Sequence, residues 1–258
     1  MSDRAGAVSP TGPQRAPTAA RTAVVWDVLR GALARFHTGD DAPLEIVDAG
    51  GGTGGAAVPL AELGHDVTVV EPNPDSLAAL ERRAAEAGVR VRALQGESRD
   101  LPQLLPECQA HLVLMHNVLE YVDDPLDALT DAMAITRPGG VISLLATNVV
   151  ATVLHRALAG HLDEARALLA APQGRWGEHD PMPRRFTEAR LVELATEAGC
   201  VRPEVHGVRV FADLLPGRVF DGEPQASSQL LDLERAAAQS PELRGIATQL
   251  HLLVERPE

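Results

Sequence analysis

The chain has 258 residues, a hydrophobic fraction of 45% and a formal net charge of -13 at pH 7, and its basic side chains other than histidine are all Arg. This length and hydrophobic content suit one large α/β domain, and the negative charge argues against a broad nucleic-acid-binding face. No segment is long and apolar enough to cross a membrane, and Cys108 and Cys200 show no metal-ligand spacing. We therefore expect two free thiols in a reducing cytoplasm, no metal and no membrane association.

The N-terminal residues 1–17 are rich in Ser, Pro, Gly and Thr and lack an apolar segment. This composition predicts a flexible tail and not a signal peptide. From about Thr18 to Phe36, apolar residues recur at the spacing of a helix with one buried face. We expect the tail to be followed by a single domain over residues 18–258.

A glycine-rich run, residues 48–55, follows the apolar segment Leu44 to Val47 and precedes a helix-like stretch. Glycines let the backbone turn and approach a ligand closely, and the next helix directs free N–H groups toward it, so this order predicts a nucleoside cofactor site. The run fits two motifs. One is the G-x-G-x-x-G of dinucleotide enzymes, and the other is the D-x-G-x-G-x-G of S-adenosylmethionine (SAM) methyltransferases, at Asp48, Gly50, Gly52 and Gly54.

The segment from His65 to Glu71 predicts a second strand, rich in β-branched residues, that ends in an acid. A carboxylate at this end of a strand can accept hydrogen bonds from both ribose hydroxyls, in either class of enzyme. Glu71 is therefore a predicted ribose ligand, and it leaves the cofactor class open.

Further strands and helices alternate along the chain. Alternation of this kind predicts a doubly wound α/β sheet with mostly parallel strands and right-handed crossovers. The last two strands are expected to form an antiparallel pair. The expected segments are helices at Pro74–Ala87, from Pro125 and at about Gln225–Gln239, and strands at Val89–Leu94, Ala110–His116, Val141–Leu145, Val205–Ala212 and Ala247–Glu255.

An insertion at about residues 148–186 interrupts this alternation. Its first part has the apolar spacing of two short amphipathic helices, and residues 172–185 are irregular. Because it follows a predicted strand, it should lie over the carboxyl ends of the strands, where ligands bind in such sheets. We expect a helical lid over the substrate.

Two later motifs favour SAM as the cofactor. Two runs follow the glycine run and the acid: Leu112 through His116-Asn-Val-Leu-Glu-Tyr121, and Arg137-Pro-Gly-Gly140. This order is found in class I SAM-dependent methyltransferases, which the chain resembles. The resemblance implies their Rossmann-like fold and SAM as cofactor. With further segments included, the chain is similar to the bacterial tRNA 5-carboxymethoxyuridine methyltransferases, which esterify the carboxylate of a wobble uridine. These segments are those around Arg21, Asn148, Gly207–Phe211 and Leu231–Glu234.

The resemblance implies a set of cofactor contacts, to which the glycine motif adds its own residues. In this sequence they are Arg21, Asp48, Gly50, Gly51, Gly52, Gly54, Glu71, Glu97, Ser98 and His116. An ionised carboxylate acceptor needs no catalytic base, because methyl transfer is an in-line displacement that depends on positioning. If the acceptor were a hydroxyl group, His116 could act as the base. Structural packing is a third role for His116.

Polar and aromatic residues outside the cofactor motifs are the candidates for binding the acceptor. Arginine suits an anion through paired N–H bonds, and Trp176 suits stacking on a base, whereas Trp26 and Phe211 fit core positions. The candidates are Tyr121, Asn148, Trp176, Arg184, Arg185 and Arg209.

Two departures from the family concern the acceptor. Glu71 stands where the family has Asp, and the insertion lacks the lysine-rich run that the family often carries for phosphate contact. Loss of phosphate contacts weakens nucleic-acid binding strongly at physiological salt. The predicted function is thus SAM-dependent O-methylation of a carboxylate or hydroxyl group, with tRNA or a small-molecule metabolite as acceptor. An NAD-dependent oxidoreductase is the alternative from another class.

Overall fold

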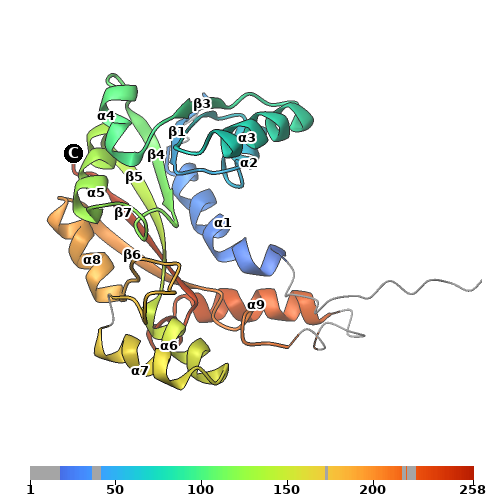
Figure 1. Ribbon diagram of the computed structural model, residues 1–258. Helices are drawn as coiled ribbons and strands as arrows, with labels where there is room; N and C mark the ends of the chain where they lie inside the picture. Colours follow the sequence, from blue (N-terminus) through green and yellow to red (C-terminus); the bar gives the residue numbers. More distant parts are fainter. Residues whose placement is uncertain (1–17, 37–41, 172–173, 217–218, 220–224) are drawn as a thin grey trace, which may run out of the picture.

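The computed structural model describes residues 18–36, 42–171, 174–216, 219 and 225–258 (Figure 1). The predicted tail, residues 1–17, lies outside the described residues. The described chain forms a seven-stranded sheet in the order β3-β2-β1-β4-β5-β7-β6. Its strands are β1 (Glu45–Ala49), β2 (Asp66–Glu71), β3 (Arg92–Gln95), β4 (Ala110–His116), β5 (Thr136–Thr147), β6 (Val201–Val208) and β7 (Gln249–Glu255).

Helices connect most of these strands, and no described helix has the length and apolarity needed to span a bilayer. A 3₁₀ turn, η1 (Ser98–Asp100), follows β3. The α-helices are α1 (Thr18–Ala34), α2 (Ala57–Glu62), α3 (Pro74–Ala87), α4 (Leu101–Leu104), α5 (Pro125–Ile135), α6 (Val149–Leu158), α7 (Leu162–Ala170), α8 (Glu188–Glu197), α9 (Ala226–Ala238) and α10 (Pro241–Arg244).

The strand pairing confirms the predicted sheet. Strands β1 to β5 pair in parallel, while β7 runs antiparallel to both of its neighbours, β5 and β6. The chain order reverses between β1 and β4, and the crevice at such a switch point is where doubly wound sheets bind ligands. The glycine run, which is the predicted cofactor site, follows β1 and therefore lies beside this switch point.

Two hydrophobic layers hold the sheet. One face packs against α1, α2 and α3, and the other packs against α4, α5 and α8, which lie on the opposite side in Figure 1. Leu29 of α1 and Leu129 of α5 are buried to within 1% exposure, one in each layer. The alternation of side chains along the central strands supplies both layers, as expected for strands covered on two faces.

Local capping explains why α3 has the bounds predicted from the sequence. Asn73 accepts a hydrogen bond from the Asp75 amide at the N-terminus, and Pro74 occupies the first helical position. Gly88 ends the helix with a φ of 71°, a conformation that glycine adopts at little cost.

Strand β6 differs from its prediction. The expected strand ran from Val205 to Ala212, but β6 ends at Val208 because Arg209 adopts a left-handed φ of 61°. The buried carboxylate of Glu234 in α9 then accepts hydrogen bonds from the three amides of residues 210–212, at 2.7–2.9 Å. A side chain thus replaces the neighbouring strand as hydrogen-bond partner, which periodicity could not reveal.

The insertion after β5 begins and ends at one point of the fold. Asn148 and Phe186 form an isolated bridge, the Phe186 amide donates to the Thr147 carbonyl, and the Val149 amide donates to the Phe186 carbonyl. Between these residues lie α6, α7 and an irregular segment, which extend away from the sheet in Figure 1. The helix pair was predicted from its apolar spacing.

Candidate functional site

The glycine run forms a tight turn between β1 and α2. Gly50, Gly52 and Gly54 all have positive φ, at 71°, 55° and 79°. The Gly50 amide donates to the Val70 carbonyl at 2.7 Å, and a Cβ atom added to Gly50 would lie 2.6 Å from a Val118 methyl carbon. A side chain at Gly50 would therefore displace a wall of the adjacent cavity.

Glu71 joins this turn to the end of β2. Its Oε2 accepts from the Gly52 amide at 3.1 Å, and its Oε1 accepts from the Asn73 amide at 3.0 Å. Asp48 lies buried at the end of β1, and its burial and the Glu71 carboxylate raise the pKa of Asp48 to about 7. A positive charge bound near the turn would therefore favour the ionised form of Asp48.

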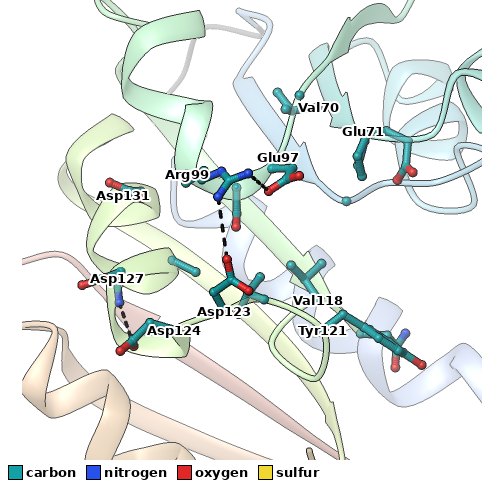
Figure 2. A pocket seen from close by; sticks show the side chains of 17 residues that line it. Val70, Glu71, Glu97, Arg99, Val118, Tyr121, Asp123, Asp124, Asp127 and Asp131 are labelled. Atoms are coloured by element: carbon teal, nitrogen blue, oxygen red, sulfur yellow. Dashed lines mark hydrogen bonds and ion pairs between the residues drawn. The ribbon is translucent and has the colours of Figure 1, made fainter. Parts of the chain in front are cut away.

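A cavity of about 620 Å³ opens beside the turn, at the switch point of the sheet. Figure 2 shows its lining side chains, which come from the ends of β1 to β4, the turn after β3 and the first turns of α5. Of the predicted residues, Gly50, Glu71, Glu97, Ser98 and Tyr121 line it.

The cavity is strongly acidic. Arg99 is the one arginine among its described lining residues, and it pairs with Glu97 at 2.9 Å and with Asp123 at 3.7 Å. A nucleoside with a cationic sulfur suits such a lining, whereas the two negative charges of a dinucleotide diphosphate would be repelled. The carboxylates are Glu71, Glu97, Asp123, Asp124, Asp127 and Asp131.

His116 is the last residue of β4, and its ring contacts the neighbouring strand β5. Its Nε2 lies 2.8 Å from Ser143 Oγ, which in turn lies 2.8 Å from Nε2 of His251. Nδ1 of His251 lies 3.5 Å from Nδ1 of His206, so three imidazoles and one hydroxyl form a row across β4, β5, β7 and β6. Burial lowers the pKa of His116 to about 4, so its ring is neutral at pH 7. This position favours the structural role for the imidazole over a base.

Asn148 is fully engaged inside the protein. It is 2% exposed, its Oδ1 accepts from the Val150 amide at the N-terminus of α6, and its Nδ2 donates to the carbonyls of Gly245 and Ala247. The predicted contact between Asn148 and the acceptor does not fit this geometry. Both polar atoms of the side-chain amide already form hydrogen bonds, which connect α6 to the segment before β7.

Trp176 and Arg185 also differ from expectation. The side chain of Arg185 is 3% exposed, and its guanidinium forms a forked ion pair with Asp180, at 2.7 and 2.8 Å. The guanidinium carbons of Arg156 and Arg185 lie 3.7 and 4.4 Å from the Trp176 ring centroid. Trp176 therefore stacks on arginines of its own chain, and Arg185 is buried in an internal pair, so neither is arranged to hold an acceptor.

Arg184 binds the loop after β4. Its guanidinium donates to the carbonyls of Leu119, Val122 and Asp123, at 3.1, 2.7 and 3.2 Å. Val122 and Asp123 line the cavity. Arg184 thus connects the insertion to the cavity wall, which its position in the sequence did not indicate.

A second polar cluster lies beyond the ends of β6 and β7. Arg21 and Arg209 both pair with Asp213, which the sequence analysis did not single out. Gln249 accepts from Arg209 and donates to Asn117, which lines the cavity. Asp213 lies four residues after Arg209 but far in the sequence from Arg21, and it has no motif around it, so only the fold reveals the cluster.

Among the described residues, no group of three or more His, Cys, Asp or Glu side chains is arranged to bind a metal ion. Cys108 and Cys200 are both free and buried, as expected.

Comparison with known proteins places these features in context. Residues 47–142 match the family model of a methyltransferase domain. The chain is 31% identical over 241 residues to a tRNA 5-carboxymethoxyuridine methyltransferase of Escherichia coli O157:H7, covering 92% of this chain and 88% of that protein. It is 30% identical over 222 residues to a ubiquinone biosynthesis O-methyltransferase of Methylobacterium sp. (strain 4-46), covering 81% and 82%.

A solved structure has the same fold. The plantazolicin methyltransferase BamL, crystallised with SAH and a triazolic desmethylPZN analog, matches with a TM-score of 0.59 at 11% identity, covering 93% of this chain and 86% of that chain. These matches confirm the predicted fold class and the resemblance drawn from the motifs.

Proposed function

We propose a reaction for this chain, which belongs to the SAM-dependent methyltransferases, in the family of the tRNA 5-carboxymethoxyuridine methyltransferases. In this reaction the chain transfers the SAM methyl group to a carboxylate oxygen of its acceptor. One observation supports this most directly: an acidic cavity adjoins the glycine turn at the switch point of the sheet. SAM supplies an activated methyl group on a sulfonium, and the cavity has the charge to hold it. The oxidoreductase alternative is set aside.

The cofactor contacts are part of the proposal. Glu71 binds the ribose hydroxyls, and it is already held in place by the Gly52 amide. Glu97 and Ser98, at the start of η1, contact the remainder of the nucleoside, and Arg21 binds a cofactor group outside the acidic cavity, as the family resemblance implies. Asp48 does not line the cavity, but a sulfonium bound there would favour its ionised form and would in turn be stabilised by that charge.

The chemistry requires little beyond positioning. A carboxylate is ionised at neutral pH and attacks without a base. Holding it in line with the methyl carbon can lower the barrier by roughly 7–11 kcal/mol in favourable cases. The His116 ring, neutral at pH 7 and hydrogen-bonded to Ser143, is consistent with a mechanism in which no proton is removed from the acceptor.

A modified tRNA uridine is the first candidate acceptor, since the relative named above acts on it, and this would place the protein in the cytoplasm. A small carboxylic acid is the second candidate. One observation favours it: the insertion's arginines contact their own chain, as Arg175 does through the carbonyls of Glu178 and Asp180. Fewer cations are then available for phosphates, and the chain's net charge of -13 opposes tRNA further.

The deciding experiment incubates the protein with methyl-labelled SAM and either tRNA containing 5-carboxymethoxyuridine or a pool of small carboxylic acids. Products are identified by mass spectrometry after nuclease digestion. A methyl ester loses its label as methanol in mild alkali, whereas an ether or a methylated amine keeps it. Alkali-labile label supports the proposal, and stable label in every product contradicts it. The Glu71→Ala variant, assayed at a SAM concentration that does not saturate it, serves as the control with reduced cofactor binding.

A further inference from the structure

The cluster around Arg209 contains polar groups that the fold does not use. Asp213 directs Oδ1 to Arg21 and Oδ2 to Arg209, and the side chains of the two arginines are each 25% exposed. The Nε groups of both arginines are buried and have no hydrogen-bond partner among the described residues. Buried donors of this kind are rare in native proteins, and each calls for a partner.

Two more unpartnered groups lie near Arg209. The Thr248 amide donates to the Arg209 carbonyl at 3.2 Å, and the buried Thr248 Oγ1 has no partner among the described residues. His155 of α6 lies close enough for Asp213 and Arg209 to affect its pKa, and its buried Nε2 also lacks a partner there. Two unpartnered groups from separate parts of the fold therefore lie near Arg209, in addition to the Nε groups of the arginines.

The charge of the cluster indicates which ligand it takes. Two guanidinium groups and one carboxylate leave a single net positive charge. Burial lowers the pKa of His155, so His155 adds no charge at pH 7. A partly buried, uncompensated cation is costly. A ligand with one negative charge would balance it, and a carboxylate also accepts several N–H and O–H bonds at once.

The cluster is continuous with the cofactor cavity. Arg209 Nη1 donates to Gln249 Oε1 at 3.4 Å, and Gln249 Nε2 donates to Asn117 Oδ1. Asn117 lines the cavity and has a left-handed φ of 58°, and Arg209 has one of 61°. Strained non-glycine backbone of this kind tends to occur at functional sites.

Resting on the proposed methyl transfer, we infer that Arg209, Thr248 and His155 form the site that binds the acceptor's carboxylate beside the cofactor. Asp213 reduces the net charge of the two arginines to one positive charge, which one negative charge on the ligand would balance. Asp213 also connects Arg209 to Arg21, the arginine proposed to bind the cofactor. The insertion contributes through His155, so its helix α6 completes the acceptor site. One carboxylate oxygen is bound, and the other is left to attack the methyl carbon.

The test measures binding without turnover, using SAH-saturated protein and 5-carboxymethoxyuridine as the probe. The carboxamide of the same nucleoside is the neutral control. Titration is followed by the arginine Nε–Hε signals in a ¹H–¹⁵N spectrum, where the Arg209 signal is identified by its loss in Arg209→Lys. We expect that signal to shift saturably with the carboxylate and not with the carboxamide. An unchanged Arg209 signal, or an equal shift with both probes, would overturn the inference.

Two variants then test binding of the acceptor carboxylate separately from methyl transfer. Thr248→Val and His155→Gln should each weaken carboxylate binding about fivefold or more while leaving the affinity for SAM unchanged. The control is Arg202→Lys, an exposed arginine that also has positive φ, at 52°, and pairs with Glu255. Thermal melting checks that each variant folds. Carboxylate binding without ester formation would contradict the proposed function alone, whereas ester formation unaffected by both variants would contradict the acceptor site alone.

Discussion

The carboxylate of Glu71 accepts a hydrogen bond from the amide of Gly52, so the acid at the end of β2 holds the glycine turn after β1. Under the proposed function Glu71 has two roles: it orders the turn, and it is the proposed ligand of the ribose hydroxyls. The Glu71→Ala variant should bind SAM and SAH about 10–100-fold more weakly, as expected for the loss of hydrogen bonds to a charged group.

Isothermal titration measures both affinities, and Glu86→Ala, which removes an exposed glutamate of α3, is the matched control. Equal SAM affinity in Glu71→Ala and the unmodified protein would show that Glu71 is not a cofactor ligand. Because Glu71 also supports the turn, the melting temperature of each variant is recorded alongside.

Gly50 and Gly64 form a natural pair for testing the turn. Both have positive φ, at 71° and 91°, but a Cβ at Gly50 would clash with Val118, whereas no atom lies within 4 Å of one at Gly64. Alanine at either position costs about 1 kcal/mol from its backbone conformation. Only Gly50→Ala should also weaken SAM binding, by tenfold or more, because it displaces a cavity wall.

The double variant Gly50→Ala/Val118→Ala tests the reason for that loss. Removing the two methyl groups of Val118 gives the new Cβ space, so part of the SAM affinity should return. If Gly64→Ala weakens SAM binding as much as Gly50→Ala, backbone strain and not the cavity wall explains the effect.

The pH dependence of stability has two opposing contributions. The depressed pKa of His116, about 4 against an ordinary 6.5, means that the unfolded chain binds more protons between these values, so stability rises with pH there. His251 and His206 act in the same direction. Asp48 acts in the opposite direction: its pKa of about 7 lies above the ordinary 3.8, so its contribution to stability falls as pH rises.

The histidines should prevail because they are more numerous. His116 alone contributes about 3 kcal/mol by its shift, close to the roughly 4 kcal/mol of opposite sign from Asp48, and the other two add to it. We expect the melting temperature to rise from pH 4.5 to pH 6.5. In Asp48→Asn the rise should be steeper, with a higher melting temperature than the unmodified protein at pH 8. A melting temperature that falls over this range would contradict the assignment.

The sequence predicted most of the fold, because its signals were local. The glycine turn, the acid ending β2 and the capped helix α3 each depend on residues within a few positions of one another. The end of β6 was mispredicted because Glu234, in another helix, binds the amides that follow it. Side-chain periodicity contains no information on such a partner.

The sequence predicted where the glycine turn and Glu71 meet, but not the surroundings of the candidate acceptor residues. Gly50 and Glu71 belong to ordered motifs, so their meeting at the cavity follows from the topology. Arg185 and Trp176 were chosen by residue type, and the structure pairs them with Asp180 and with neighbouring arginines. A polar or aromatic side chain in a loop can contact either a ligand or other residues of its own chain. The sequence does not show which of the two it contacts.

Arg184 should couple the insertion to the cofactor cavity. Its guanidinium holds three carbonyls of the loop at residues 119–123, two of which belong to residues lining the cavity. Arg184→Met keeps an unbranched apolar stem and removes these hydrogen bonds, so the loop should open more often and SAM should bind several-fold more weakly. Hydrogen exchange of the amides at residues 119–123 should accelerate in the free protein and recover with saturating SAM. Arg166→Met, at an exposed arginine of α7, is the control; exchange that is equally slow in both variants would show that Arg184 does not hold the loop.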